Sequence, residues 1–459
     1  MEQETTTDTW TKTKAVAKNT LRKYFLFLLR LTPHQNIAQT VLSYTFIGTV
    51  LLSLPFMNTV DVSFIDNLFT AAAAVSTSGL NSVNFADSYT FLGKLIVLIL
   101  IQIGGVGYMT FSSFIFLSIS QKHRLRHHQQ ENLEAEVSLP KTLTLTDFLW
   151  AAMLFTFVAE SIGAMVLFNY FRQHDFSIFN AAWYSIFHSV SAFCTAGFSL
   201  WNNSLEPFAD DTTMNFVIAA LALAGSMGFI VVTDVFNFIR RKTQQISLTT
   251  KIIVLTTMAL LFFGTLVLFI TTPGLTLLEA FFQSVAAVTT VGFNTMHIGL
   301  MSSCSLLILM LLMSIGGSPS GTASGIKTTT FVSVLAITVA RLRMHKHVEI
   351  LGRRLPIVRL YTATSTVLLY TFFLFISIFL LTWTEHFPFL ALVVEANSAL
   401  STGGLSTGIT GDLTVWGKLI LIATMIVGRI GVMTFGIALT SAEDDDEEHK
   451  PVKTEDVAI

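Results

Sequence analysis

Hydrophobic residues gather in eight long runs along the chain, separated by shorter and more polar segments. Each run approaches the roughly 20 residues that a helix needs to cross a bilayer. The pattern therefore predicts eight membrane-spanning helices. They begin near Ile37, Phe91, Thr146, Met214, Ile252, Ser305, Val358 and Val415.

A shorter apolar segment lies between the two spans of each successive pair. Segments of about a dozen residues are typically re-entrant rather than spanning. Each one ends in Ser or Thr followed closely by Gly, and the four segments cover residues 64–77, 178–195, 277–290 and 389–402. The chain is therefore predicted to be an all-α polytopic membrane protein with four consecutive repeats of span, short helix, glycine turn and span.

The four turns resemble one another in sequence. They read STSGLN at 76–81, CTAGFS at 194–199, TTVGFN at 289–294 and STGGLS at 401–406. A second glycine cluster follows at matching depth in the second span of every repeat, in the segments IGGVGYMTF, AGSMGFIVV, IGGSPSG and VGRIGVMTF. Glycine-rich spans ordinarily indicate close helix packing, and we expect that role for the clusters of the first, second and fourth repeats.

The turn glycines suit a site for an ion that has lost its water. Backbone carbonyls must then replace the hydration shell, which requires extended or positive-φ geometry that glycine adopts cheaply. The C-termini of the preceding helices would add their negative dipole ends near a cation. No acidic residue interrupts the turns, which argues against a calcium-type ring of carboxylates. The pattern favours a weakly hydrated monovalent cation.

The sixth span is interrupted by the sequence GGSPSG at 316–321. Proline lacks an N–H and clashes with the preceding turn, and each glycine destabilises a helix by about 1 kcal/mol. Two interpretations are open, a proline kink and an inserted loop. The apolar stretch from Ser305 to Arg341 exceeds the length of one straight span, which favours the loop.

Two charged residues fall inside predicted spans. An arginine near the bilayer centre costs at least about 2.5 kcal/mol, so Arg429 in the last span is expected to have partners. Glu160 lies in the middle of an apolar run. It is either an ion-pathway residue or a hydrogen-bonded contact between helices, and the second interpretation is favoured.

Composition and charge agree with a membrane protein. Hydrophobic residues make up 52% of the 459 residues and charged residues 12%, against about 25% charged in soluble proteins. The net charge of −2 does not suggest nucleic acid as a partner. Twenty-two of the 27 Lys and Arg residues lie before the first span or after an even-numbered one. Because positive residues collect in cytoplasmic loops, both termini are predicted to be cytoplasmic. The external connections are acidic, which predicts a cation-attracting mouth.

These patterns divide the chain into consecutive segments. The predicted boundaries are a cytoplasmic N-terminal segment at 1–36, repeat 1 at 37–120, a cytoplasmic loop at 121–145, repeat 2 at 146–241, repeat 3 at 249–343 with a loop at 316–325, repeat 4 at 356–440 and an acidic cytoplasmic tail at 441–459.

The chain resembles the Ktr/Trk/HKT superfamily of potassium transporters and is most similar to the Ktr-type membrane subunit. The resemblance covers nearly everything after about Thr32, and its most specific parts are AGFSLW at 196–201, GFN at 292–294, SGTASGIKTTTF at 320–331 and GRIGVMTF at 428–435. It implies a pseudo-fourfold pore within one chain, a homodimer in the cell membrane, and a cytosolic nucleotide-binding regulatory ring of the RCK type. The family also shows Na⁺ dependence. The chain itself contains no nucleotide-binding glycine motif, so nucleotide sensing is expected in the partner.

The resemblance also implies site residues. The expected K⁺ filter comprises Thr77, Ser78, Gly79, Thr195, Ala196, Gly197, Thr290, Val291, Gly292, Thr402, Gly403 and Gly404. The expected gate comprises Gly316, Gly317, Ser318, Pro319, Ser320, Gly321, Thr322, Ala323, Ser324 and Gly325, together with Arg429, whose family analogue contacts the gate loop. No cofactor other than the transported K⁺ is implied.

The sequence departs from the family pattern beside two of the turns. Cys194 and Thr195 stand where Asn-Asn is usual, and Val288 stands where an arginine tends to lie. Gly79 matches the K⁺ pattern, because a serine at the first glycine accompanies sodium transport in the plant branch of the superfamily.

Two other functional classes were weighed against a pore. An ion-coupled secondary carrier typically shows inverted repeats with broken helices at the midplane, whereas the four units here have the same orientation. A membrane-embedded enzyme would need a convergent pair of catalytic residues within the spans. His188 beside Ser189 is the candidate for such a pair, and packing within the short helix is the favoured interpretation.

Overall fold

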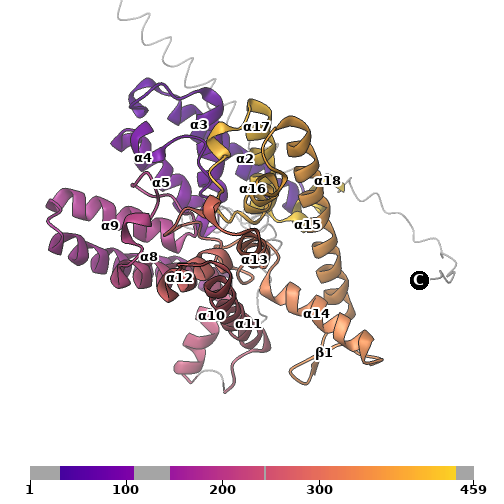
Figure 1. The fold of residues 1–459 in the computed structure, drawn as a ribbon. Coiled ribbons are helices and arrows are strands. Elements are labelled where there is room, and N and C mark those ends of the chain that lie inside the picture. The colour runs from indigo at the N-terminus through magenta and orange to yellow at the C-terminus, as the bar shows by residue number, and fades with distance from the viewer. Residues whose placement is uncertain (1–30, 108–144, 242–243, 441–459) are drawn as a thin grey trace, which may run out of the picture.

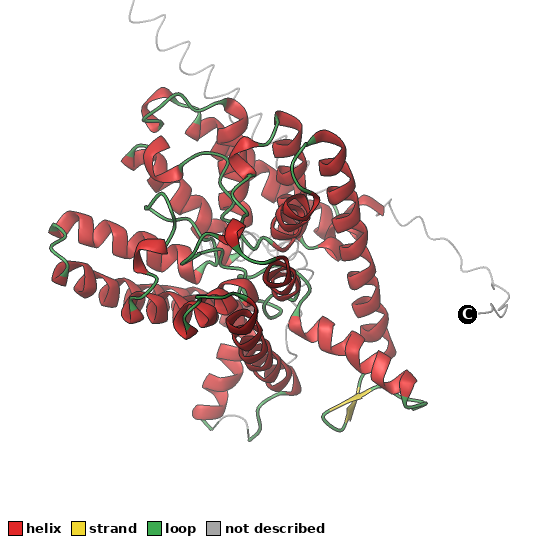
Figure 2. Cartoon of the chain, in the orientation of Figure 1, coloured by secondary structure: helices red, strands yellow, loops and turns green. Residues whose placement is uncertain are grey.

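The computed structural model describes residues 31–107, 145–241 and 244–440. Residues 1–30 of the predicted N-terminal segment, residues 121–144 of the predicted 121–145 loop and the acidic tail lie outside the described residues. The described part is mostly helical (Figure 2), with one small antiparallel pair formed by β1 (Glu349–Ile350) and β2 (Arg353–Arg354). The predicted helical class is confirmed in this coarser form.

The helices come in four successive groups, each of which begins with a helix of 20 to 29 residues and continues with a short helix of 12 to 16 residues. The first group comprises α2 (Pro33–Leu52), α3 (Phe64–Ser76), α4 (Phe85–Ser88) and α5 (Phe91–Val106), and the second comprises α8 (Leu145–Gln173), α9 (Ile178–Phe193) and α10 (Thr212–Ile239). The third group comprises α11 (Leu248–Thr271), α12 (Leu277–Val288), α13 (Ser303–Ser314) and α14 (Thr328–Leu342). The fourth group comprises α15 (Ile357–Thr384), α16 (Phe389–Ser401), α17 (Val415–Ile430) and α18 (Val432–Thr440). Short 3₁₀ turns lie at Pro55–Met57, Glu206–Phe208, Ile298–Leu300 and Thr410–Asp412.

Helix starts follow local sequence signals. A Ser, Thr or Asp at the N-cap accepts a hydrogen bond from the first turn in most of these helices, as Ser63 does for α3 and Asp211 for α10. Such a cap satisfies a backbone N–H that has no partner within the helix. The helices α14, α15 and α16 lack one, because their N-caps are Lys327, Pro356 and Pro388.

Within the described residues, four helices are long and apolar enough to span a membrane, against eight predicted spans. By length and composition α8, α10, α11 and α15 qualify, and α17 with α18 would add a fifth span that bends by 96°. Helices do begin within about four residues of all eight predicted starts. The predicted interruption of the sixth span is present, and the described residues also show interruptions at glycines in the fourth and eighth spans, which the prediction did not include.

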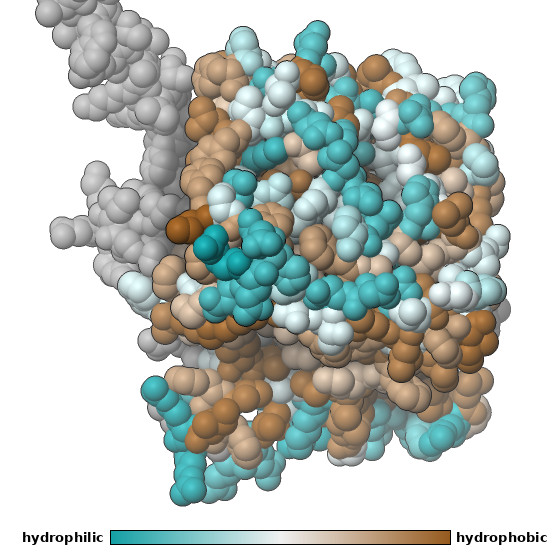
Figure 3. Space-filling view, turned by 60° about the vertical axis from the view of Figure 1, so that its left-hand side comes forward, coloured by the Kyte–Doolittle hydropathy of each residue, from teal (hydrophilic) through white to brown (hydrophobic). Residues whose placement is uncertain are grey.

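The four groups of helices are arranged around a common centre (Figure 1), with the chain colour passing around that centre from indigo to yellow. Large apolar side chains cover the outside, including Phe157, Phe262 and Trp383, which are 70%, 73% and 78% exposed. In Figure 3 hydrophobic residues form a band across the lower part of the visible face, with hydrophilic residues gathered above it. Exposed apolar surface of this kind suits contact with lipid.

The glycines of the second spans serve packing, as predicted. A Cβ atom on Gly104, Gly225 or Gly428 would collide with the carbonyl oxygen of Val75, Phe193 or Leu400 respectively. Each of these carbonyls lies four residues before a turn glycine. The second spans therefore pack directly against the ends of the short helices.

The backbone also breaks three residues beyond each of these glycines. The φ angles of Gly107, Gly228 and Gly431 are 94°, 78° and 90°, outside the helical region. The expectation that these clusters serve packing alone was therefore incomplete. Within the described residues an interruption occurs in the second spans of the second, third and fourth groups and is longest in the third, whereas α5 ends at Val106, next to the last residue described there.

Candidate functional site

All four short helices end in the same backbone motif. The residue before each turn glycine donates its N–H to a carbonyl five residues earlier, with N···O distances of 2.8, 2.8, 3.1 and 2.7 Å, and the preceding threonine donates to a carbonyl three residues earlier at 3.1–3.2 Å. This pair of bonds defines a Schellman cap. The threonines adopt the left-handed conformation that glycine usually fills, with φ between 51° and 53° at Thr77, Thr195, Thr290 and Thr402.

The sign of φ alternates from residue to residue within each turn. Each threonine and each turn glycine has positive φ, at 79°, 66°, 85° and 71° for the glycines, whereas the residue between them does not. A non-glycine residue in the left-handed region costs about 1–2 kcal/mol, so four such threonines mark a site whose geometry is imposed by its surroundings. The side-chain oxygens of Ser78, Thr290 and Thr402 are buried and have no hydrogen-bond partner among the described residues.

The four turns form a closed ring. A Cβ atom on Gly79 would lie 2.5 Å from the carbonyl oxygen of Ala196, and one on Gly197 would meet the carbonyl oxygen of Val291. A Cβ atom on Gly292 would lie 2.9 Å from the Cα atom of Gly404, and one on Gly404 would meet the carbonyl oxygen of Ser78. Each turn thus contacts the next, and the fourth contacts the first. Only glycine fits where backbones approach so closely.

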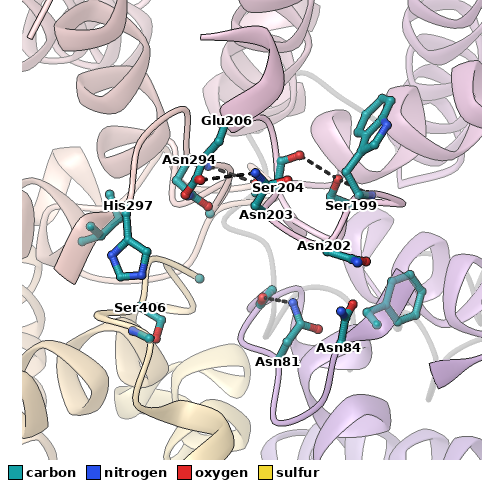
Figure 4. Close-up of a pocket in the computed structure, with 18 of the residues that line it drawn as sticks. Asn81, Asn84, Ser199, Asn202, Asn203, Ser204, Glu206, Asn294, His297 and Ser406 are labelled. Carbon is teal, nitrogen blue, oxygen red and sulfur yellow. Dashed lines mark hydrogen bonds between the residues drawn. The ribbon is translucent and has the colours of Figure 1, made fainter. Parts of the chain in front are cut away.

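A cavity of about 310 Å³ lies on one side of this ring and is lined by all four turn glycines (Figure 4). Amide side chains from different repeats face it, including Asn81, Asn202 and Asn294. Its lining contains one carboxylate, Glu206, which accepts hydrogen bonds from Asn294 at 3.0 Å and Asn203 at 3.4 Å. Asp87 lies next to this lining, because its carboxylate accepts hydrogen bonds from the lining residues Asn84 at 3.1 Å and Asn202 at 2.8 Å. Five asparagines line the cavity, and the acidic mouth stays a prediction.

Two buried side chains brace the turns from behind. His188 donates from Nδ1 to the carbonyl of Tyr184 at 2.8 Å, which leaves Nε2 to accept the N–H of Leu200 at 3.3 Å. The hydroxyl of Ser189 donates instead to the carbonyl of Glu160. His188 and Ser189 thus have separate partners, and the packing interpretation of His188 is confirmed.

Glu395 in α16 is the second brace and was missed by sequence reasoning. It is fully buried, and its carboxylate accepts hydrogen bonds from Ser406 at 2.6 Å, from Thr410 at 2.8 Å, and from the N–H and hydroxyl of Thr407 at 3.0 and 3.2 Å. The segment after Gly404 is therefore tied to its own short helix. Its signal in the sequence was a carboxylate in an apolar segment.

Replacing Glu395 with alanine should lower the free energy of unfolding by about 2–4 kcal/mol, because hydrogen bonds to a charged group contribute about 1.5–3 kcal/mol each and their donors would be left buried. Denaturant unfolding in detergent measures this loss. Glu279→Ala is the control, since that half-buried carboxylate only caps the start of α12 and its loss should cost about 1 kcal/mol. Equal effects of the two substitutions would contradict the bracing role.

The 316–325 loop lies on the opposite side of the ring from the cavity. Residues 315–327 between α13 and α14 are not helical, so the alternative of a proline kink is wrong. The loop docks against the break in α10: Ser318 donates its N–H to the carbonyl of Ser226 at 3.0 Å, and Ser320 Oγ accepts the N–H of Ile230 at 3.2 Å. The loop thus supplies an acceptor to α10 beyond its break at Gly228.

Thr322 and Arg429 join this loop to the turns. The hydroxyl of Thr195 donates to that of Thr322 at 3.1 Å. Arg429 donates to the carbonyl of Thr322 at 2.6 Å, to the hydroxyl of Thr77 at 3.0 Å and to the carbonyl of Gly104. The expected contact between Arg429 and the loop is present, and the same guanidinium also holds the first turn.

Glu160 makes a contact between helices. Gln102 of α5 donates its amide to both carboxylate oxygens of Glu160 at 3.0 and 3.2 Å, and the thiol of Cys194 donates to Glu160 at 3.7 Å. Cys194, which departs from the family pattern, therefore belongs to a polar cluster behind the second turn. This geometry agrees with the favoured interpretation of Glu160 as a hydrogen-bonded helix contact.

Comparison with known proteins decides the family. The model of the TrkH family, described as a cation transport protein, matches residues 31–449. The chain belongs to the TrkH cation transport family. Members of the TrkH family are transporters and not enzymes, which confirms the prediction on this point, and the expected resemblance to the Ktr/Trk superfamily is confirmed as well.

Several relatives within the TrkH family align over most of the chain. "Ktr system potassium uptake protein B" of Bacillus subtilis is 36% identical over 91% of this chain and 95% of its own length. "Potassium/sodium uptake protein NtpJ" of Enterococcus hirae is 34% identical, over 89% and 93%. The crystal structure of the potassium transporter TrkH from Vibrio parahaemolyticus has the same fold, with a TM-score of 0.68 at 19% identity over 90% of this chain and 86% of the other.

Proposed function

We propose that this chain is the potassium-translocating membrane subunit of a bacterial K⁺ uptake system and conducts through a pseudo-fourfold pore. The observation that carries the proposal is the closed ring of four glycine turns, each with the same Schellman cap. In this proposal the filter consists of residues 77–79, 195–197, 290–292 and 402–404.

The chemistry of the ring favours K⁺. The turns offer carbonyl and hydroxyl oxygens without a carboxylate, and a weakly hydrated monovalent ion exchanges water for such dipoles most readily. Because the sign of φ alternates along each turn, successive carbonyls can face the same side, where several can contact one ion. The relatives named for potassium uptake support this choice.

The 316–325 loop and Arg429 form the gate in this proposal. The loop lies directly behind the ring and is bonded to two of its turns through Thr322 and Arg429. A cytosolic nucleotide-binding ring of the RCK type would move it, the membrane subunit would form a homodimer in the cell membrane, and both termini would face the cytoplasm. The relative named as a Ktr system protein supports a complex with several subunits.

Growth rescue tests the function. Expression in a bacterium that lacks its own K⁺ uptake should restore growth at limiting K⁺, and more strongly when a cytosolic regulatory subunit is co-expressed. A Gly292→Asp variant is the matched negative control, because a carboxylate cannot fit 2.9 Å from Gly404. K⁺ uptake into vesicles that requires an imposed Na⁺ or H⁺ gradient would favour an ion-coupled carrier. A normally expressed protein that does not restore growth would contradict the proposal.

A further inference from the structure

A second cavity of about 520 Å³ lies away from the ring, between the N-terminal parts of α11, α14 and α15. In Figure 1 these helices occupy the lower and right-hand side of the molecule. Pro319 of the 316–325 loop also lines this cavity, and Lys327, which follows the loop, lines it as well. The cavity therefore borders the proposed gate, and none of the proposed filter residues lines it.

The lining is positive. Lys327 and Arg359 contribute cationic side chains, and no carboxylate lines the cavity. The helices α11, α14 and α15 all begin here with 24, 15 and 28 residues, and the N-terminus of each carries roughly half a positive charge. The carboxylate of Asp234 lies next to the lining, because it accepts a hydrogen bond from the N–H of the lining residue Ser247 at 2.8 Å.

Backbone donors at the start of α14 lack acceptors. The N-cap residue Lys327 makes no side-chain capping bond. The N–H of Thr328 donates to Gly317 at 3.2 Å and that of Phe331 to Lys327, but the N–H groups of Thr329 and Thr330 have no acceptor in the described part of the chain. Thr329 and Thr330 both line the cavity. Two adjacent N–H groups at a helix start suit an anionic oxygen.

The rest of the lining is part hydroxyl and part apolar. Thr249 and Ser333 add hydroxyls, whereas Ile230, Leu248 and Ile252 add aliphatic surface. A small inorganic anion would use only the polar part. A phosphate that carries an apolar tail would use both parts.

We propose that this cavity is a binding site for a phosphate group, held by Lys327, Arg359 and the N–H groups of Thr329 and Thr330. The source of the phosphate is the headgroup of an anionic phospholipid or free phosphate. Both share the chemistry that the site recognises, namely several anionic oxygens that accept from cations and from a helix N-terminus.

The site is connected to the 316–325 loop by direct bonds. Lys327 donates to the carbonyl of Ala323 at 2.5 Å, and the N–H of Thr328 donates to Gly317 at 3.2 Å. A ligand held by the first turn of α14 stabilises the loop arrangement that forms the site. Any effect on ion flux rests on the proposed gate, whereas binding itself does not.

Binding to the purified full chain tests the site. The probes are dioleoylphosphatidylglycerol and inorganic phosphate, with dioleoylphosphatidylcholine as the neutral lipid, and the readouts are the thermal unfolding midpoint and lipid retention by native mass spectrometry. The wild type should be stabilised by at least one phosphate probe. The double variant K327Q/R359Q should need at least about tenfold more probe, since charge-assisted bonds are the strong ones.

Two further variants keep the test decisive. Arg359 is exposed, so R359Q alone should fold normally and weaken binding by about threefold. Arg343→Gln is the matched control, because Arg343 is an exposed cation at the end of the same α14 that does not line the cavity. A response to phosphatidylglycerol alone identifies a lipid headgroup, and a response to both probes shows that free phosphate suffices. Equal binding by all variants, or no response of the wild type, overturns the proposal.

Discussion

Replacing Gly79 with serine is expected to lower the preference for K⁺ over Na⁺ by about tenfold, which corresponds to 1.4 kcal/mol. Gly79 has a φ of 79°, and a Cβ atom there would lie 2.5 Å from the carbonyl oxygen of Ala196 and 3.2 Å from the Cα atom of Gly197. The second turn must then move outward, which widens the ring and spoils its fit to K⁺. Competitive flux of the two ions in reconstituted vesicles measures the change.

Gly274→Ser is the matched control for backbone strain. Gly274 has a similar φ of 86°, but a Cβ atom there would meet nothing within 4 Å. This substitution therefore carries the conformational penalty of a side chain at positive φ without crowding the ring. Selectivity should be unchanged in this control. An unchanged K⁺ to Na⁺ ratio in Gly79→Ser would remove Gly79 from the filter.

Deletion of Ser318–Ser324 is expected to raise K⁺ flux in the absence of a regulatory partner by about tenfold or more, if the loop costs at least 1.4 kcal/mol to displace. The structure makes this deletion feasible. A Cβ atom on Gly316 would lie 3.2 Å from the Cα atom of Gly325, so the two ends of the loop already touch. Joining them leaves α13 and α14 in place. Flux of K⁺ into vesicles reports the result.

A point variant separates gating from damage in this experiment. Thr322→Val removes the hydroxyl that bonds to Thr195 and to the carbonyl of Phe193 while it keeps the shape of the side chain. It should raise flux less than the deletion does, and both variants should keep the K⁺ to Na⁺ ratio. Flux that falls in the deletion, at normal expression and normal thermal stability, would mean that the loop does not block the path.

Repetition made much of the fold predictable from sequence. Apolar runs and re-entrant lengths are local properties, so the helix starts, the four turns and the non-helical 316–325 segment could all be placed. Matching glycines also predicted close packing of the second spans, since close approach excludes a side chain, but not that their neighbours are the ends of the short helices. The partner of Arg429 in the loop came from the family resemblance rather than from the residues alone.

The features that could not be predicted from the sequence depend on contacts between distant residues or on the sign of the φ angle. The left-handed threonines could not be foreseen, because threonine rarely adopts that conformation and the ring imposes it. Glu395 gave only the signal of an acid in an apolar run, and its partners are defined by the folded turn. Which side chains face the cavity also could not be predicted, because the charge of an external loop does not determine where its side chains point.

The braces behind the turns differ from one quarter of the ring to the next. His188 holds the second turn, Gln283 donates to Thr295 in the third at 3.1 Å, and Glu395 holds the fourth. In a ring of four identical subunits every substitution would be imposed four times. Because all four turns here belong to one chain, a single substitution alters one quarter of the ring. Natural variation can therefore adjust ion preference in small steps without disrupting the whole ring.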